Sequence, residues 1–197
     1  KSTLINLITG LLVPSRGNVF FDGINIHNNL EQFRSHIGYV PQDTMLLNES
    51  IESNITFCRN AVSEHALEEV LHICEVDVIM KTNSMSIDTV IGEKGNKLSG
   101  GQKQKIALSR ALYRKPKLLI IDEGTSNIDS DTEERILKRV KSVYPDMTII
   151  IVSHRLSTVR KADRIIVLDK SQVAENGEYA QLLDNGTVFR KIFANQI

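Results

Sequence analysis

The sequence is poor in cysteine. Its 197 residues contain only two, Cys58 and Cys74, and their spacing matches no paired metal-ligand motif. Cysteine used this sparingly is typical of a protein from a reducing compartment. We therefore expect both residues to be free thiols that are buried or half buried.

The sequence also lacks a long hydrophobic run and an excess of charge. Its longest apolar runs, such as residues 118–121 and 149–152, are strand-sized, whereas a membrane-spanning helix needs about 18 apolar residues. The 24 basic and 24 acidic side chains give a formal net charge of zero, which excludes nucleic-acid binding through bulk positive charge. The first residues have no signal-peptide pattern. These absences predict a soluble, intracellular protein.

The composition is that of an ordinary globular protein. Hydrophobic residues make up 41% and charged residues 24% of the chain, which argues against disorder. A chain of this length forms one domain, or a core with a smaller lobe. Strands bounded by turn residues or proline are predicted in five places: about 17–23, 37–41, 117–122, 148–153 and 162–169.

The middle of the chain is predicted to be helical. Between about residues 50 and 115 no strong strand pattern occurs, and apolar residues recur at the spacing of one helical stripe: Leu67, Val70, Leu71 and Cys74. Further helices are predicted over about 101–115 and over 130–143, the second with acids near its start and bases near its end. This order indicates a parallel sheet flanked by helices and interrupted by a helical lobe.

A buried strand that ends in two acids is a strong chemical signal. Residues 118–121 are four aliphatic side chains in a row, as in a central parallel strand. Asp122 and Glu123 follow at the carboxyl end, where open α/β sheets hold ligands. Either acid alone could cap the next turn, but an adjacent pair is costly unless a cation or a reaction uses it. The pair predicts Mg²⁺ at Asp122, through water, and a general base at Glu123.

The first three residues, Lys1, Ser2 and Thr3, allow two interpretations. They could be the end of a phosphate-binding loop, Gly-x-x-x-x-Gly-Lys-[Ser/Thr], whose glycines would lie before Lys1. Lys1 would then reach the β- and γ-phosphates, Ser2 would offer its hydroxyl to Mg²⁺, and the backbone N–H groups of the following helix would face the phosphates. The alternative is a plain helix start.

The segment Leu98-Ser99-Gly100-Gly101-Gln102 decides between the interpretations. Ser99 is a helix N-cap, and the two glycines let a large anion approach the backbone in front of a helix dipole. A glycine hinge would explain any two of these residues, but not five in this order ahead of the buried strand. The segment resembles the signature sequence of the ATP-binding cassette (ABC) family, which implies that Ser99, Gly100, Gly101 and Gln102 contact ATP.

The resemblance covers essentially the whole chain and implies roles for further residues. Gln42, after Tyr-Val-Pro, resembles the glutamine that senses Mg²⁺ and the attacking water; alone it would be a surface turn residue. Residues 126–129 resemble the loop that crosses to a partner ATPase, with Asp129 also a candidate helix-start acid. His154 resembles the switch histidine at the γ-phosphate, although a lone histidine at a strand end is more often structural.

Two segments resemble the exporter branch of the family. Residues 89–95, Thr-Val-Ile-Gly-Glu-Lys-Gly, are similar to the exporter loop that touches the membrane domain, with Glu93 the expected contact. The alternative for Glu93 is an exposed acid in a glycine loop. Residues 154–158, His-Arg-Leu-Ser-Thr, resemble the exporter form of the histidine motif. Both segments imply an exporter.

The sequence departs from the family pattern in two respects. Gly124 and Asn127 stand where exporters commonly have alanine, and we expect them to loosen the loop that pairs with the second subunit. The family's first strands, its adenine-stacking aromatic residue and its phosphate-loop glycines are missing. We therefore expect a piece that begins inside the phosphate loop (Walker A motif), and that binds ATP poorly and is inactive alone.

The sequence therefore predicts an ATP-hydrolysing domain with a P-loop NTPase core and an inserted helical subdomain. The core would comprise about residues 1–44 and 116–197, and the subdomain about 45–115. The resemblance implies ATP and Mg²⁺, a second ABC ATPase domain and a transmembrane domain as partners, no nucleic acid, and a location on the cytoplasmic face of a membrane. The alternatives are a soluble ABC ATPase of DNA repair or translation and a nucleotide-binding regulatory module without hydrolysis.

Basic residues gather near the segment 103–117: Lys103, Lys105, Arg110, Arg114, Lys115 and Lys117. They are spread around the predicted helix rather than gathered on one side. We therefore expect a solvated helix face and not a nucleic-acid patch.

Overall fold

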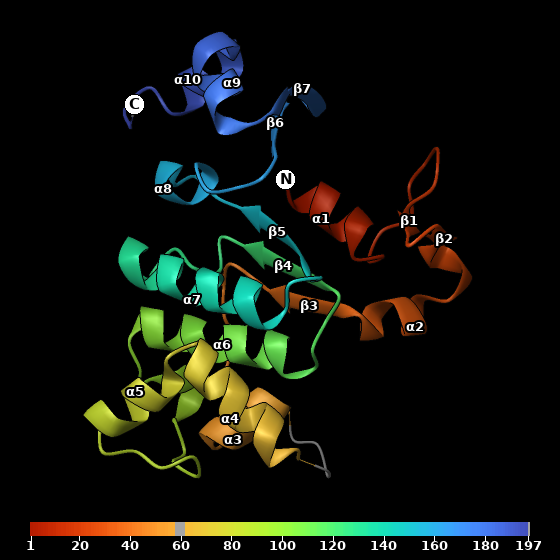
Figure 1. Cartoon of the computed structure of the whole chain (residues 1–197). Coiled ribbons are helices and arrows are strands. Elements are labelled where there is room, and N and C mark those ends of the chain that lie inside the picture. The colour runs from red at the N-terminus through yellow and green to blue at the C-terminus, as the bar shows by residue number, and fades with distance from the viewer. Residues whose placement is uncertain (58–61, 197) are drawn as a thin grey trace. The chain divides into compact units, whose positions relative to one another are not determined.

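The computed structural model describes residues 1–57 and 62–196 (Figure 1). The chain divides into two compact units: residues 2–151, and Lys1 together with the segment from Val152 onward. The prediction for the Cys58 thiol falls outside the described residues.

The larger unit contains most of the elements. In chain order they are α1 (Ser2–Ile8), β1 (Phe20–Phe21), β2 (Ile24–Asn25), η1 (Ile26–Asn28), α2 (Leu30–Ser35), β3 (Ile37–Val40), α3 (Ile51–Thr56), α4 (Glu64–Ile73), α5 (Val76–Thr82), η2 (Glu93–Gly95), α6 (Gly100–Tyr113), β4 (Leu118–Asp122), α7 (Ser130–Val143) and β5 (Thr148–Val152). The last residue of β5 already belongs to the smaller unit.

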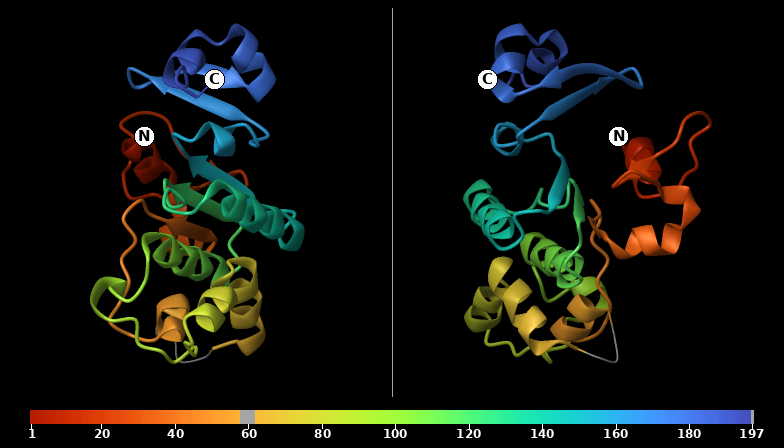
Figure 2. Two further views of the ribbon diagram at one scale, coloured as in Figure 1. Left: turned by 90° about the vertical axis from the view of Figure 1, so that its left-hand side faces the viewer. Right: turned by 45° about the vertical axis from the view of Figure 1, so that its right-hand side comes forward.

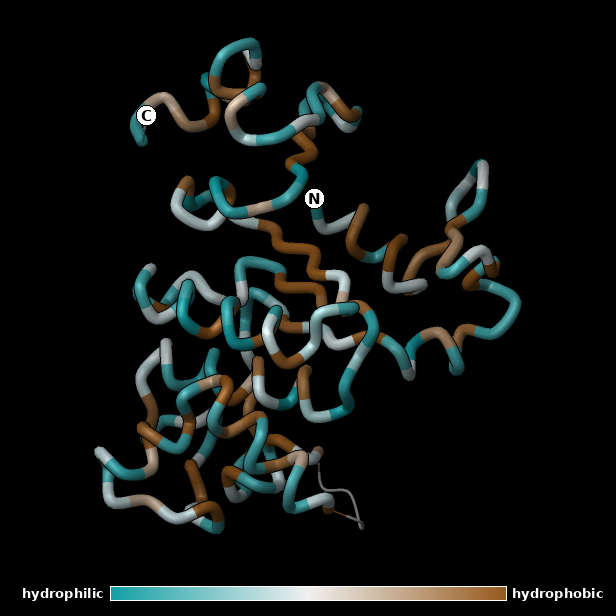
Figure 3. Tube along the Cα trace, in the orientation of Figure 1, coloured by the Kyte–Doolittle hydropathy of each residue, from teal (hydrophilic) through white to brown (hydrophobic). Residues whose placement is uncertain are grey.

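A three-stranded sheet in the order β3-β4-β5 lies at the centre of the larger unit. Strands β3 and β4 pair in parallel, with Val40 opposite Ile121. The strand β4 is buried along its aliphatic residues 118–121, and β4 and β5 are hydrophobic along their length in Figure 3. The predicted strands at 37–41, 117–122 and 148–153 are thus confirmed.

The first predicted strand, 17–23, is shorter than expected. Only Phe20 and Phe21 are extended, and they pair antiparallel with β2 across a tight turn. The turn residues Asp22 and Gly23 have φ angles of 49° and 78°. Because this left-handed backbone cannot continue a strand, the chain reverses within two residues.

The helices predicted between about residues 50 and 115 are confirmed for the described part of that range, which contains α3 to α6 and no strand. The helix α6 contacts α3, α4, α5 and β3, and it lies between these helices and the sheet (Figures 1 and 2). The predicted apolar stripe on α4 is buried in the core. At its end Cys74 is a buried free thiol, as expected, and burial raises its pKa to about 12.

The smaller unit consists of α8 (Leu156–Val159), β6 (Ile165–Asp169), β7 (Gln172–Gly177), α9 (Tyr179–Asn185) and α10 (Thr187–Ile192). Strands β6 and β7 form an antiparallel pair, and a small core forms around the buried Phe189. The strand predicted at 162–169 begins at Ile165, and the elements after it were not predicted. No helix in the described part of the chain has both the length and the apolar character needed to cross a membrane.

A buried acid joins three helices of the larger unit. Glu75, between α4 and α5, has a left-handed backbone (φ 57°) and only 10% of its side chain is exposed. Its carboxylate pairs with Lys105 of α6 at 3.1 Å and with Arg135 and Arg139 of α7 at 3.0 and 3.5 Å. Burial alone would raise the pKa of Glu75, but the hydrogen bonds and charges of Arg135 and Lys105 hold it below its usual value.

The expectation of a solvated basic face on α6 is wrong for two residues. Lys105 is half buried in the ion pair with Glu75. Arg110 donates to the carbonyl oxygens of Asn54 and Met45 at 2.7 and 2.9 Å. Since both side chains bridge α6 to neighbouring segments, they are part of the helical packing and not of its surface charge.

We predict that Glu75→Gln lowers the free energy of unfolding at neutral pH by on the order of 3 kcal/mol, because it leaves three cations without their shared anion. The loss should be largest above the unfolded-state pKa of about 4.3 and should shrink as the pH falls through the lower pKa of the folded state. Denaturant unfolding between pH 3 and 7 measures it.

The matched control is Glu134→Gln, which removes an exposed i,i+4 pair with Lys138 on the same helix α7. A surface pair of this kind contributes at most about 0.5 kcal/mol. Equal losses for the two variants, or a loss at Glu75 that does not change with pH, would contradict the role of the buried cluster.

Candidate functional site

Three predicted site residues follow the carboxyl ends of neighbouring parallel strands. Asp122 ends β4 and Glu123 follows it, both half buried, and the exposed Gln42 lies two residues after β3. Because Val40 is opposite Ile121 in the parallel register, the residues that follow the two strands lie at the same edge of the sheet. This edge is where open α/β sheets bind ligands.

The turn after β4 is tight. Glu123 has a φ of 50°, a left-handed conformation that is uncommon for a residue with a side chain. The next residue, Gly124, lies against Val40: a Cβ atom there would be 2.5 Å from the Val40 Cγ1 atom. Gly124 therefore lets the chain turn closely over β3.

Tyr39 of β3 is a neighbour of Asp122 that the sequence did not reveal. Burial raises the pKa of Tyr39, and the charge of the Asp122 carboxylate and its hydrogen bond with the tyrosine raise it further. The phenol therefore stays protonated and donates to the carboxylate. The Tyr-Val-Pro-Gln strand motif was the available signal, but only the register with β4 shows which acid the tyrosine meets.

The loop from Glu123 to Asp129 (the acid loop below) is also held by α7. Thr125 donates to the buried carboxylate of Glu133 at 2.6 Å. Asp129 caps α7 by accepting from the backbone N–H of Thr132 at 2.9 Å, which holds the pKa of Asp129 below its usual value. The helix-start interpretation of Asp129 is thus confirmed.

The first turn of α6 carries the signature residues. Ser99 is the N-cap, as predicted, and accepts from the backbone N–H of Gln102 at 3.3 Å. The Gln102 side chain in return accepts from the Ser99 N–H at 2.9 Å, which completes a capping box. The sequence analysis did not foresee this second role for Gln102.

This first turn packs on the acid loop. A Cβ atom at Gly101 would lie 2.7 Å from the Asn127 carbonyl oxygen, and one at Gly100 would lie 3.1 Å from the Asn127 side-chain amide nitrogen. The two glycines therefore have a structural role, because they let the first turn of α6 approach the backbone of the acid loop closely.

In the smaller unit, the Lys1 ammonium group contacts the ring of His154 through both ring nitrogens. His154 is exposed and lies two residues after β5. Two residues that the sequence assigned to phosphate contacts are thus brought together. Ser2 and Thr3 open α1 in the larger unit and are exposed.

The exporter-like loop 89–95 is ordered by the segment before α3. Val90 forms a β-bridge with Ser50, and Gly95 packs on the buried Leu46. Glu93 is exposed in the short helix η2. Its side chain is therefore available for a contact outside the chain.

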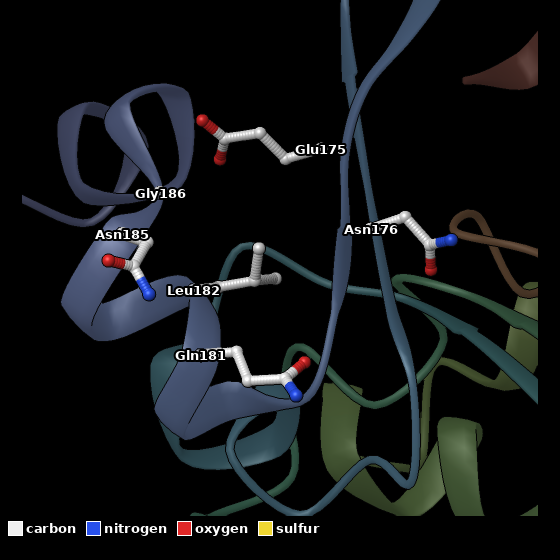
Figure 4. A pocket seen from close by; sticks show the side chains of 6 residues that line it. All are labelled: Glu175, Asn176, Gln181, Leu182, Asn185 and Gly186. Carbon is white, nitrogen blue, oxygen red and sulfur yellow. The ribbon is translucent and has the colours of Figure 1, made fainter.

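A cavity of about 430 Å³ in the smaller unit contains no predicted site residue. It is lined by Glu175, Asn176, Gln181, Leu182, Asn185 and Gly186 (Figure 4). The Glu175 carboxylate accepts from the backbone N–H groups of Thr187, Val188 and Phe189 at 2.7 to 2.8 Å. The one acid at this cavity is thus committed to capping α10.

Comparison with known proteins identifies the family. The family model described as ABC transporter matches residues 1–126. The chain belongs to the ABC transporter family. This ABC chain is 38% identical over its full length to the mitochondrial iron-sulfur clusters transporter ABCB7 of Danio rerio, of which it covers 27%. It is 40% identical, over 94% of its length, to the exotoxin translocation ATP-binding protein PaxB of Pasteurella aerogenes, of which it covers 26%.

A solved structure confirms the fold of this ABC domain. The structure of a bacterial Atm1-family ABC exporter with ATP bound matches with a TM-score of 0.93 and 34% identity, over 100% of this chain and 35% of that one. The predicted α/β ATPase fold with a sheet flanked by helices is therefore confirmed, and the chain is a nucleotide-binding domain of the exporter type. It spans roughly a third or less of the length of the relatives it matches.

We predict that Gly101→Ala destabilises the protein more than Gly100→Ala. Both changes add the same methyl group at the same end of α6, but only the one at Gly101 meets backbone. Overpacking of this kind costs about 1–3 kcal/mol, whereas the contacts at Gly100 are with Asn127 side-chain atoms at 3.1 to 3.3 Å and are relieved by a smaller shift. Denaturant unfolding of the two variants in parallel measures the difference, and equal losses would refute this packing.

Proposed function

We propose that this domain binds ATP with Mg²⁺ and hydrolyses it to power export through a transmembrane partner at the cytoplasmic face of a membrane. The observation that carries the proposal is the grouping of Gln42, Asp122 and Glu123 at one sheet edge, next to the loop on which α6 packs.

The phosphates and the metal would be held by one copy. Lys1 would pair with the β- and γ-phosphates and the N–H groups of Ser2 and Thr3 would face them. Oxygen donors suit Mg²⁺: the Ser2 hydroxyl, the Gln42 amide oxygen and the Asp122 carboxylate, which Tyr39 orients. No three His, Cys, Asp or Glu side chains in the described residues are placed to hold a metal themselves.

Glu123 would act as the general base on the attacking water. Its strained backbone and half-buried position hold the carboxylate at the edge where the γ-phosphate would lie. His154 would contact the γ-phosphate, a role that its contact with Lys1 supports. Gln42 would sense the metal and the water from the neighbouring strand.

A second ABC ATPase domain would supply the rest of each site. The capped tip of α6, with residues 99–102, would face the nucleotide held by the other copy, with its dipole toward the phosphates. Asp129, at the end of the acid loop, would lie where the two copies meet. Binding would close the pair and hydrolysis would reopen it.

The exporter assignment draws on the loop 89–95 and on the relatives. Glu93 is exposed on a loop that is fixed to the segment following Gln42, so a change at Gln42 could reach a membrane partner through this short path. The relatives differ in what their names say they move, iron-sulfur clusters or an exotoxin. We therefore propose the exporter class and no particular substrate.

We predict that Glu123→Gln in the full-length protein lowers kcat for ATP hydrolysis by roughly 100-fold or more, because the amide cannot accept the proton of water. Equilibrium ATP binding should change little, and ATP should still drive association of the two domains. Phosphate release and nucleotide binding measure the two effects.

The control is Glu134→Gln, which neutralises a carboxylate of α7 that pairs with Lys138. It should leave kcat within twofold of the unaltered protein. Undiminished turnover in Glu123→Gln would exclude Glu123 as the base. Absence of turnover in the unaltered full-length protein would favour the non-hydrolysing module instead.

A further inference from the structure

A buried glutamine on α6 bonds to the acid loop with both ends of its amide. Gln104 is 2% exposed. Its carbonyl oxygen accepts from the backbone N–H of Asn127 at 2.8 Å, and its amide nitrogen lies 3.2 Å from the Ser126 hydroxyl oxygen, to which it donates. These bonds join residues more than 20 positions apart in the chain.

A glutamine at this depth is costly unless its polar atoms are satisfied. A buried amide without partners loses hydration that nothing replaces. The neighbouring positions on α6, Ile106, Ala107 and Leu108, are apolar and buried. An aliphatic side chain would fill the space at position 104 without this cost, so the loop contacts are the reason that explains a glutamine there.

The loop is anchored on two further sides. Thr125 donates to Glu133 of α7, and Gly124 lies against Val40 of β3. These contacts fix the part of the loop next to Glu123. Gln104 fixes the next part, at residues 126 and 127, directly beneath the signature glycines that pack on Asn127.

We propose that Gln104 is a positioning residue that fastens the acid loop to the first turn of α6, so that both move as one body toward the partner copy. The proposal rests on the proposed function, in which residues 99–102 and Asp129 serve the site shared with the other copy. In this proposal Gln104 itself touches no nucleotide. It sets the distance between the first turn of α6 and the acid loop, which must both reach the partner copy.

The test compares three variants of the full-length protein. Gln104→Leu removes both bonds and keeps the volume, and kcat for ATP hydrolysis should fall at least tenfold with less than a threefold change in ATP affinity. Gln104→Glu, whose carboxyl group burial would hold neutral, keeps an oxygen that accepts from Asn127 and an O–H that donates to Ser126, and it should keep kcat within threefold. Ser109→Ala deletes a buried hydrogen bond of the same helix away from the loop and should keep kcat within twofold while lowering Tm.

A second readout does not depend on turnover. The N–H group of Asn127 should be protected from hydrogen exchange in the unaltered protein and in Ser109→Ala. Its exchange should be at least tenfold faster in Gln104→Leu, because the acceptor is gone.

The outcomes separate the two proposals. Gln104→Leu with normal kcat, Gln104→Glu as impaired as Gln104→Leu, or Ser109→Ala as impaired as either would overturn the positioning role. An Asn127 N–H that exchanges equally fast in all three variants would overturn it as well. If the proposed function itself is wrong, the result differs: the unaltered protein releases no phosphate although its Asn127 N–H is protected from hydrogen exchange.

Discussion

The close packing of the first turn of α6 on the backbone of the acid loop is the constraint on which this domain depends. Gly101 lies so near the Asn127 carbonyl oxygen that no side chain fits between them. Ser99 and Gln102 satisfy the helix end through their capping box, and Gln104 satisfies the Asn127 N–H from one turn deeper. The helix tip and the acid loop are therefore joined by close packing and by hydrogen bonds.

Other elements of the larger unit hold the first turn of α6 and the acid loop in place. Helix α6 contacts three helices on one side and β3 on the other. Glu75 ties α6 to α7 through Lys105 and Arg135, and α7 holds the other end of the loop through Glu133 and Thr125. Ionic and hydrogen-bonded contacts therefore connect the helical lobe to the loop without a break.

The sequence revealed what depends on local pattern. Aliphatic runs, helix caps and motif spacing can be recognised from neighbouring residues alone. They predicted the strand 117–122, the helix 130–143, the N-cap Ser99 and the acids Asp122 and Glu123. Family membership followed from the same motifs and is confirmed by the family match over residues 1–126. The roles of the single site residues remain proposals.

What the sequence did not reveal depends on contacts between distant segments. Gln104 and Tyr39 look like ordinary helix and strand residues until the fold places them beside Asn127 and Asp122. Lys105 looked solvent-exposed because nothing local shows that Glu75, 30 residues earlier, would meet it. β7, α9 and α10 were missed because their polar, half-exposed residues carry a weak periodic signal.

The most direct test of this account is an experimental structure of the intact protein with ATP bound. The account predicts that in each copy the Gln104 side chain stays within hydrogen-bond distance of the Asn127 N–H. It also predicts that each triphosphate lies between residues 99–102 of one copy and Asp122 and Glu123 of the other. A triphosphate that meets both segments within a single copy, or an α6 tip separated from the acid loop, would contradict it.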